Sequence, residues 1–153
     1  MIAAIRVRGT VNVRGEIEDT MKMLHLTRAN HCSLVREDPS YLGMLRKVKD
    51  YITYGPIDAE TLSQLITERG RLKGNRPITD DYVKEHTAFN SIKEFAEAIV
   101  EGKADYRELP EVKPLFRLHP PIKGHGTFKR HYSVGGSLGN RGEAINELIR
   151  RML

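Results

Sequence analysis

The stretch GGSLG at residues 135–139 has the residue types of a nucleophile elbow, G-x-S-x-G, a sharp turn that presents a catalytic serine. In α/β-hydrolases the acid and then the histidine follow that serine in the chain. Here the last aspartate, Asp105, and the last histidine, His131, both precede Ser137. Other serine enzymes use other orders, so a small α/β hydrolase-like enzyme using Ser137 stays an alternative hypothesis. The order favours a plain loop residue, and we expect alanine at position 137 to be nearly silent.

Phosphate-loop and metal motifs are also incomplete in this sequence. The glycines of residues 135–142 do not form G-x-x-x-x-G-K-[ST] or G-x-G-x-x-G, so nucleotide binding is not indicated. A zinc site built on cysteine pairs is excluded because the chain has one cysteine. We therefore expect no metal and no cofactor, and a buried thiol at Cys32. The histidines that suggest ligands form two groups, His25 with His31 and His119 with His125 and His131.

Basic residues in a glycine- and proline-rich segment, residues 110–142, indicate a different chemistry. Lys123, Lys129, Arg130 and Arg141 have no acid near them in this segment, and Phe116, Phe128 and Tyr132 are interspersed. Lysine and arginine neutralise phosphates, and aromatic rings stack on unpaired bases. Because the segment is too polar to bury a core, we expect an extended basic arm that becomes ordered on binding RNA. On the first strand and beside the first helix, four arginines extend this surface: Arg6, Arg8, Arg14 and Arg28.

The charge distribution supports a polyanionic partner. The chain has 153 residues, a net charge of +5 and 39% hydrophobic residues. Residues 113–153 contain eight basic and two acidic side chains, whereas residues 76–112 contain five basic and nine acidic ones. An acidic middle between basic ends favours binding of a polyanion by the ends. The single cysteine and the absence of a long apolar run predict a cytoplasmic protein without a membrane segment.

The elements that must position these residues follow from hydrophobic spacing. Strands are predicted at residues 2–9, 31–37 and 51–55, with helices at about 15–26 and 38–51 between them. Alternation in IAAIRVR predicts a first strand with one covered and one polar side. Such strand–helix–strand crossovers favour parallel pairing, with the helices on one sheet face. We therefore predict an α/β (α+β) fold whose β-α-β-α-β core, of ferredoxin-like type, spans residues 1–57.

Residues 58–153 are predicted to form a C-terminal extension of helices, the basic arm at 110–142 and a terminal helix. Asp58, Thr79 and Ser91 have the types and positions of helix N-caps, and Ser91 with Glu94 matches a capping box. Asn140 and Gly142 are expected to form the turn and cap of the last helix, EAINELIRRML. Its apolar positions are predicted to dock on the body, although a module that binds another protein through this helix is a further alternative.

These stretches together resemble one protein family. AIRVRGTVNVRGEIEDTMKMLHLTRANHCSLV, YLGMLRKVKDYITYG, FNSIKEFAEAI and the FRLHPP…GGSLGNRGEAINELIRRML ending are similar to the uL30 family of large-subunit ribosomal proteins, in its long archaeal form. The resemblance covers nearly the whole chain, and its last stretch is the most specific. Bacterial members resemble only about the first third, the β-α-β-α-β unit.

The resemblance implies a structural, non-enzymatic, rRNA-binding component of the large ribosomal subunit, located on the cytoplasmic ribosome. It implies large-subunit rRNA and neighbouring ribosomal proteins as partners, a position near 5S RNA, and no small-molecule substrate. The residues expected to bind RNA are Arg8, Arg14, Arg28, Lys123, Lys129, Arg130, His131, Asn140 and Arg141.

Overall fold

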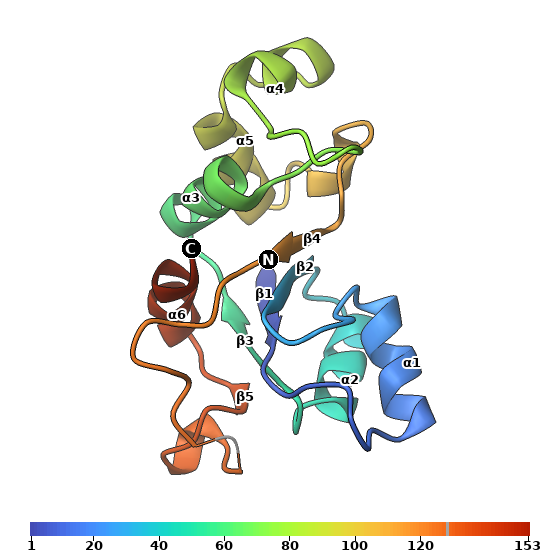
Figure 1. Ribbon diagram of the computed structural model, residues 1–153. Coiled ribbons are helices and arrows are strands. Elements are labelled where there is room, and N and C mark those ends of the chain that lie inside the picture. Colours follow the sequence, from blue (N-terminus) through green and yellow to red (C-terminus); the bar gives the residue numbers. More distant parts are fainter. Residues whose placement is uncertain (128) are drawn as a thin grey trace.

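The computed structural model describes residues 1–127 and 129–153, and its described strands form one mixed sheet (Figure 1). The order of strands across the sheet is β4-β2-β1-β3-β5. Their bounds are Ile2–Arg6 (β1), His31–Val35 (β2), Ile52–Pro56 (β3), Leu115–Arg117 (β4) and Gly139–Asn140 (β5). The helices are Gly15–Met23 (α1), Pro39–Lys47 (α2), Ala59–Arg69 (α3), Asp80–His86 (α4), Ile92–Val100 (α5) and Ala144–Met152 (α6). Two short 3-10 helices, Tyr106–Glu108 (η1) and Tyr132–Val134 (η2), complete the fold.

The predicted β-α-β-α-β order is confirmed, but the predicted parallel pairing of neighbouring strands is wrong. β1 pairs antiparallel with β2, Ile5 opposite Cys32, and antiparallel with β3, Arg6 opposite Ile52. The loops on either side of α1 return the chain to the end of the sheet that it left, so β2 runs back along β1. β2 and β3 then share one direction, but β1 lies between them, which is the split β-α-β arrangement of ferredoxin-like folds.

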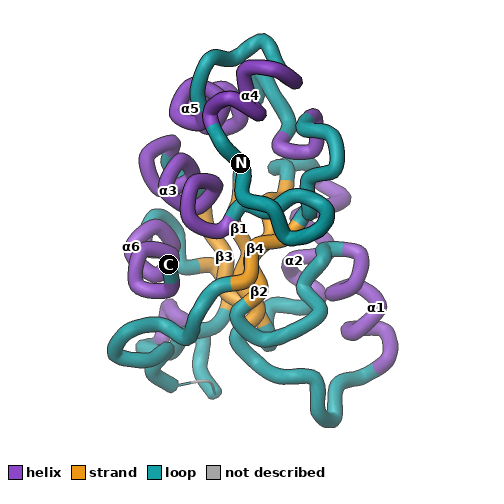
Figure 2. The backbone as a smooth tube through the Cα atoms, turned by 45° about the horizontal axis from the view of Figure 1, so that its top comes forward, coloured by secondary structure: helices purple, strands orange, loops and turns teal. Residues whose placement is uncertain are grey.

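Both faces of the sheet are covered, so the prediction of a polar side on the first strand is also wrong. α1 and α2 pack on one face, where Ala4, Met21 and Leu45 belong to one buried apolar cluster. On the other face, α3, α5 and α6 cover Ala3, Ile5 and Cys32 in a second, larger cluster (Figure 2). All five residues of β1 are buried, because the C-terminal extension covers the face that the first two helices leave open.

The extension is built into the sheet rather than appended to it. Its strands β4 and β5 are the two edge strands, and β5 pairs in parallel with β3. The predicted arm therefore contains a strand near each end, and the described residues between these strands form loops and the short helix η2. The last helix ties down the start of this loop, because the carbonyls of Met152 and Arg151 accept hydrogen bonds from the amides of His119 and Ile122, at 3.0 and 3.1 Å. The division at residue 57 stays a prediction.

Several predicted helix starts are confirmed by their hydrogen bonds. The side chains of Asp58, Thr79 and Ser91 accept from backbone amides three residues ahead, at 2.7, 3.2 and 3.2 Å. The Glu94 side chain, however, accepts a hydrogen bond from the amide of Asn90 and not from the amide of Ser91, so the predicted capping box is not formed.

The last helix is docked as predicted. The side chains of Ile145, Leu148, Ile149 and Met152 are buried in the larger apolar cluster. This apolar face is therefore not available to a partner protein. This excludes the hypothesis of a module that binds another protein through the apolar face of the last helix.

Candidate nucleic-acid interface

The loops that carry the predicted basic residues gather at one end of the sheet. β1 and β4 end there, and β2, β3 and β5 begin there. We call the loops at residues 7–14, 24–30, 48–51 and 118–138 the loop end. The amide of Val7 donates to the carbonyl of Tyr51 at 2.9 Å, and the amide of Leu118 donates to that of Asn30 at 3.1 Å. Residues 118–138 connect the two edge strands, so this segment crosses the sheet at the loop end.

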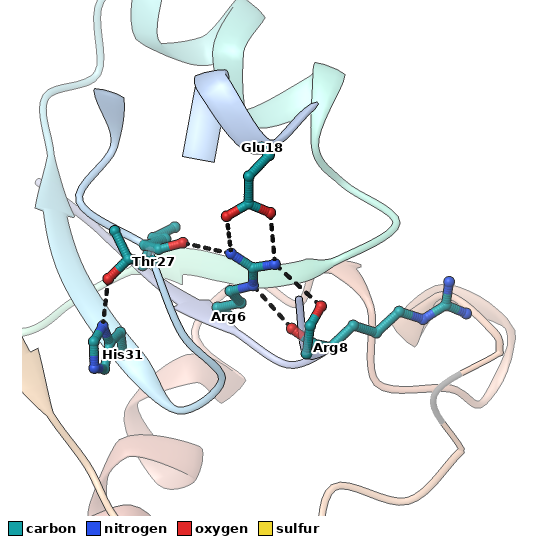
Figure 3. A network of polar contacts seen from close by, with 7 residues as sticks. Arg6, Arg8, Glu18, Thr27 and His31 are labelled. Carbon is teal, nitrogen blue, oxygen red and sulfur yellow. Dashed lines mark hydrogen bonds and ion pairs between the residues drawn. The ribbon is translucent and has the colours of Figure 1, made fainter. Parts of the chain in front are cut away.

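Arg6 organises the loop end from inside, although the sequence suggested an exposed RNA contact (Figure 3). Its side chain is fully buried, and its guanidinium binds both carboxylate oxygens of Glu18, at 3.2 and 3.1 Å. It also donates to the carbonyls of Arg8, Gly9 and Leu26, at 2.9, 3.1 and 2.9 Å. One buried cation thus holds helix α1, the loop after β1 and the loop before β2. Its hydrogen bonds, followed by its charge, lower the pKa of Glu18.

The other predicted arginines of the N-terminal unit reach the surface of the loop end. Arg14, just before α1, and Arg28, just before β2, are exposed. Arg8 is half-buried, and its guanidinium carbon lies 5.7 Å from the centre of the Tyr51 ring. Arg6 therefore fixes the loop of Arg8 directly and the loop of Arg28 through Leu26.

Residues 118–138, which cross the loop end, carry three further predicted residues that are exposed, namely Lys123, Lys129 and Arg130. The loop is attached to the body at several points. His125 Nε2 lies 3.3 Å from Asn30 Oδ1, and Arg151 Nη1 donates to the carbonyls of Ile122 and Gly124, at 3.2 and 3.3 Å. These bonds present the basic side chains from an anchored loop, which lowers the ordering entropy that binding would cost.

Arg141 lies inside the loop end instead of on its surface. It is 8% exposed, its Nε donates to Thr53 Oγ1 at 2.9 Å, and its Nη2 donates to the carbonyl of Ser137 at 3.2 Å. Its guanidinium carbon stands 4.9 Å from the centre of the Tyr132 ring, and burial lowers its pKa. This arginine supports the loop, so we leave it out of the proposed contact surface.

His131 and Asn140 have structural contacts of their own. His131 Nε2 lies 2.9 Å from Asp50 Oδ1, which joins the arm to the turn before β3. Asn140 is exposed, and its side chain accepts from the amide of Gly142 at 2.9 Å, which confirms the predicted turn. The residue that caps α6 is Glu143, without a side-chain hydrogen bond, so the predicted capping of that helix by Asn140 is wrong.

The aromatic residues of the arm differ in what they offer to bases. Phe116 is fully buried in the core, so it is not available for stacking on RNA. Tyr132 is 43% exposed, with Arg141 over its ring. Phe128 lies outside the described residues.

The surroundings of Ser137 oppose a nucleophilic role. Its side chain is fully buried, and its hydroxyl donates to the backbone carbonyl of Thr127 at 2.9 Å. A nucleophilic serine needs a base that accepts its proton, and a peptide carbonyl is not such a base. Because of this buried bond, we now expect alanine at position 137 to cost stability.

Three histidines at or beside the loop end, His25, His31 and His125, contribute little positive charge near neutral pH. Burial lowers the pKa of His25 and His31, and it lowers that of His125 to about 4. For His31, Arg117, Arg28 and Arg6 add to this effect through their charge. These three histidines therefore add little to the positive charge that the lysines and arginines supply. Within the described residues, no group of three His, Cys, Asp or Glu side chains is placed to hold a metal ion.

Sequence reasoning missed two basic residues near this surface. Lys49 is exposed in the turn before β3, and Arg117 is exposed at the end of β4, opposite His31. Neither residue lies within residues 118–138, and both come to the loop end only through the antiparallel topology. The signal for Lys49 is its position just before a strand that starts where β1 ends. None of the described helices is long and apolar enough to cross a membrane.

The fold and this surface define a small mixed α/β protein with a cationic loop end. The matches to known proteins point to one family. The family profile described as Ribosomal protein L30p/L7e matches residues 2–52. The chain is 54% identical over 152 residues to "Large ribosomal subunit protein uL30" of Archaeoglobus fulgidus, with 99% of each chain covered. Its identity to the protein of that name is 51% over 152 residues in Methanocorpusculum labreanum, with 99% of each chain covered. In Methanopyrus kandleri it is 52% over 149 residues, which covers 96% of this chain and 100% of the relative.

This chain belongs to the uL30 family of large ribosomal subunit proteins. The family supports a structural role in the ribosome and makes an enzyme the weaker hypothesis.

Proposed function

We propose that this protein binds and braces large-subunit rRNA through the loop end during ribosome assembly and translation, as a non-enzymatic component of the cytoplasmic ribosome without a cofactor. Neighbouring ribosomal proteins are its other partners, and 5S RNA lies nearby. The carrying observation is that exposed basic side chains from separate loops gather at one end of the sheet, where the buried Arg6 fixes two of those loops. The proposed contacts in the loop end are Arg8, Arg14, Arg28, Lys123, Lys129 and Arg130, with His131 at their border. Asn140, on β5, is a further proposed contact outside the loop end.

The chemistry of this surface suits a phosphate backbone. Several of its lysine and arginine side chains are exposed, and none of the ion pairs described above involves them. They can therefore pair with phosphates at a low cost in free energy. Each phosphate that is neutralised releases counterions from the RNA, so affinity falls steeply as salt rises. About six such contacts would reduce affinity about a thousandfold between about 50 and 200 mM salt.

The test is the salt dependence of binding to large-subunit rRNA. Lys129→Gln with Arg130→Gln removes two exposed charges, and we expect the slope of log affinity against log salt to become shallower by about 1.4–1.8. Its matched control is Lys84→Gln with Lys93→Gln, two exposed lysines on α4 and α5, which carries the same loss of charge. The control is expected to keep the slope of the unmodified protein. A complex that is insensitive to salt, or equal slopes for both variants, would contradict the proposal.

A further inference from the structure

A second cluster of basic side chains lies at the outer edge of β4, where the edge strand has no neighbour in the sheet. A pocket there is bounded by the end of α3, the turn that follows it and the chain leading into β4. The described residues that line it are Arg69, Arg71, Asn75, Lys113, Leu115 and Arg117. Four of these six side chains are cationic, and no carboxylate is among them.

The pocket is held in shape by main-chain bonds between distant segments. The amide of Lys113 donates to the carbonyl of Arg71 at 2.9 Å, and Leu72 forms an isolated bridge with Val112. The Arg71 side chain is directed by a bond of 2.8 Å from its Nη1 to the carbonyl of Gly70. The cations are therefore brought together by the fold and not by flexible side chains alone.

None of the described residues that line the pocket supplies a negative charge to balance these cations. Like charges held close together repel, and a solvated surface relieves this by letting the side chains spread. Here the Nε of Arg69 is buried and has no hydrogen-bond partner among the described residues. The neighbouring acid, Glu111, is already paired with Arg76 at 2.7 Å. Guanidinium and ammonium groups that line one pocket suit an anion with several acceptor oxygens, and a phosphate group has that chemistry.

The pocket continues the basic surface of the loop end. Arg117 lines the pocket and stands opposite His31 in the pairing of β4 with β2. His31 in turn lies within electrostatic reach of both Arg117 and Arg28. The amide of His31 also donates to the carbonyl of Arg28 at 3.3 Å, so a row of positive charge runs from Arg28 past His31 to Arg117 and into the pocket. This continuity favours a long polyanion over an acidic protein patch or a separate small ligand.

We propose that the pocket binds a backbone phosphate of the same RNA that contacts the loop end, so that the RNA continues from the loop end along the β4 edge. This inference rests on the proposed function, because it extends the RNA surface to residues outside the loop end. Arg69 and Arg71 hold the phosphate from the α3 side, and Lys113 and Arg117 hold it from the β4 side.

The test removes the two pocket charges on the β4 side with Lys113→Gln and Arg117→Gln, which preserve side-chain length more closely than alanine does. Binding to large-subunit rRNA is measured across a salt series for this variant, for the Lys129→Gln/Arg130→Gln variant and for the Lys84→Gln/Lys93→Gln control. We expect the pocket variant to make the slope shallower by about 1.4–1.8, so that raising salt fourfold costs it about tenfold less affinity than it costs the unmodified protein. Combining the pocket and loop substitutions should add their two effects.

The outcomes separate this inference from the proposed function. A shallower slope for the loop variant alone overturns the pocket and leaves the function standing, whereas no change in either variant overturns both. A pocket effect no larger than that of the control also overturns the inference. A parallel titration of the unmodified protein follows the amide signals of Lys113 and Leu115 by NMR. Inorganic phosphate that shifts these signals where RNA does not would mark a small-ligand site and overturn it as well.

Discussion

Replacing Arg6 with methionine tests whether one buried cation holds the loop end together. Methionine fills much of the same space, so the cavity is small and the effect reports mainly on polar contacts. The substitution removes the donors of three backbone carbonyls and the partner of the Glu18 carboxylate. The carbonyl of Leu26 belongs to a fully buried residue, while Gly9 is exposed and Glu18 is 23% exposed, so water replaces part of what is lost.

Breaking a buried ion pair by removing one partner costs about 3–5 kcal/mol, and water access to Glu18 places this case near the lower limit, at about 3 kcal/mol. A protein of this size would lose about 6–12 °C in melting temperature. Glu18→Gln should relieve part of this cost in the double variant, with a coupling of about 1–3 kcal/mol. Arg6→Lys keeps the charge without the planar fork and should fall between methionine and the unmodified protein.

The assay is urea unfolding followed by circular dichroism at neutral pH, repeated at lower pH. Because Arg6 lowers the pKa of folded Glu18, the stability from this pair is present above the ordinary value of 4.5 and is lost as the pH falls through the folded value. Arg6→Met should lack this acid-dependent loss. A change in stability below about 0.5 kcal/mol, or an additive double variant, would refute the reasoning.

Three further substitutions, one of them with a matched control, test other contacts. In Gly55→Ala the new Cβ meets the backbone carbonyl oxygen of Gly142, so we expect a loss of about 1–3 kcal/mol in urea unfolding. Gly43→Ala, in open space on α2, is its control and should stabilise by about 0.5–1 kcal/mol; equal effects would contradict the packing. Ser137→Ala should cost about 0.5–1.5 kcal/mol by the same measurement, and no loss would show that its buried bond is unimportant. Burial lowers the pKa of His125 to about 4, so unfolded chains bind its proton more readily, and stability should fall as the pH drops from 6.5 toward 4. His125→Asn should lose less stability over that range, and an unchanged pH profile would contradict this.

Helix positions were predictable because their signals are local. Apolar spacing located α1, α2 and α6, and the caps at Asp58 and Thr79 located the starts of α3 and α4. Each signal needs only three to seven neighbouring residues, since one turn of helix brings them together. The same spacing carries no information on which end of the sheet a chain returns to, so the strand directions could not be predicted in this way.

The candidate site was predictable in its chemistry and less so in its residues. The basic composition of the arm located Lys123, Lys129 and Arg130, all of which are exposed. Arg6 and Arg141 have the same residue type but are buried, because partners from other elements surround them. Alternation along a strand cannot show that Glu18 will cover its polar side. Whether a given arginine faces solvent or the interior is decided by tertiary contacts.

The bonds from the last helix to the arm also set an order of events during synthesis. The carbonyls of Arg151 and Met152 hold the first residues of the loop that crosses the end of the sheet. A growing chain has made its basic loop before it makes these two residues, so the loop has no anchor there until α6 has been made. The first strands likewise keep one apolar face uncovered until α3, α5 and α6 have been made. A chain truncated before Arg151 would thus contain every proposed RNA-contacting side chain and still lack the bonds from α6 to the start of the basic loop.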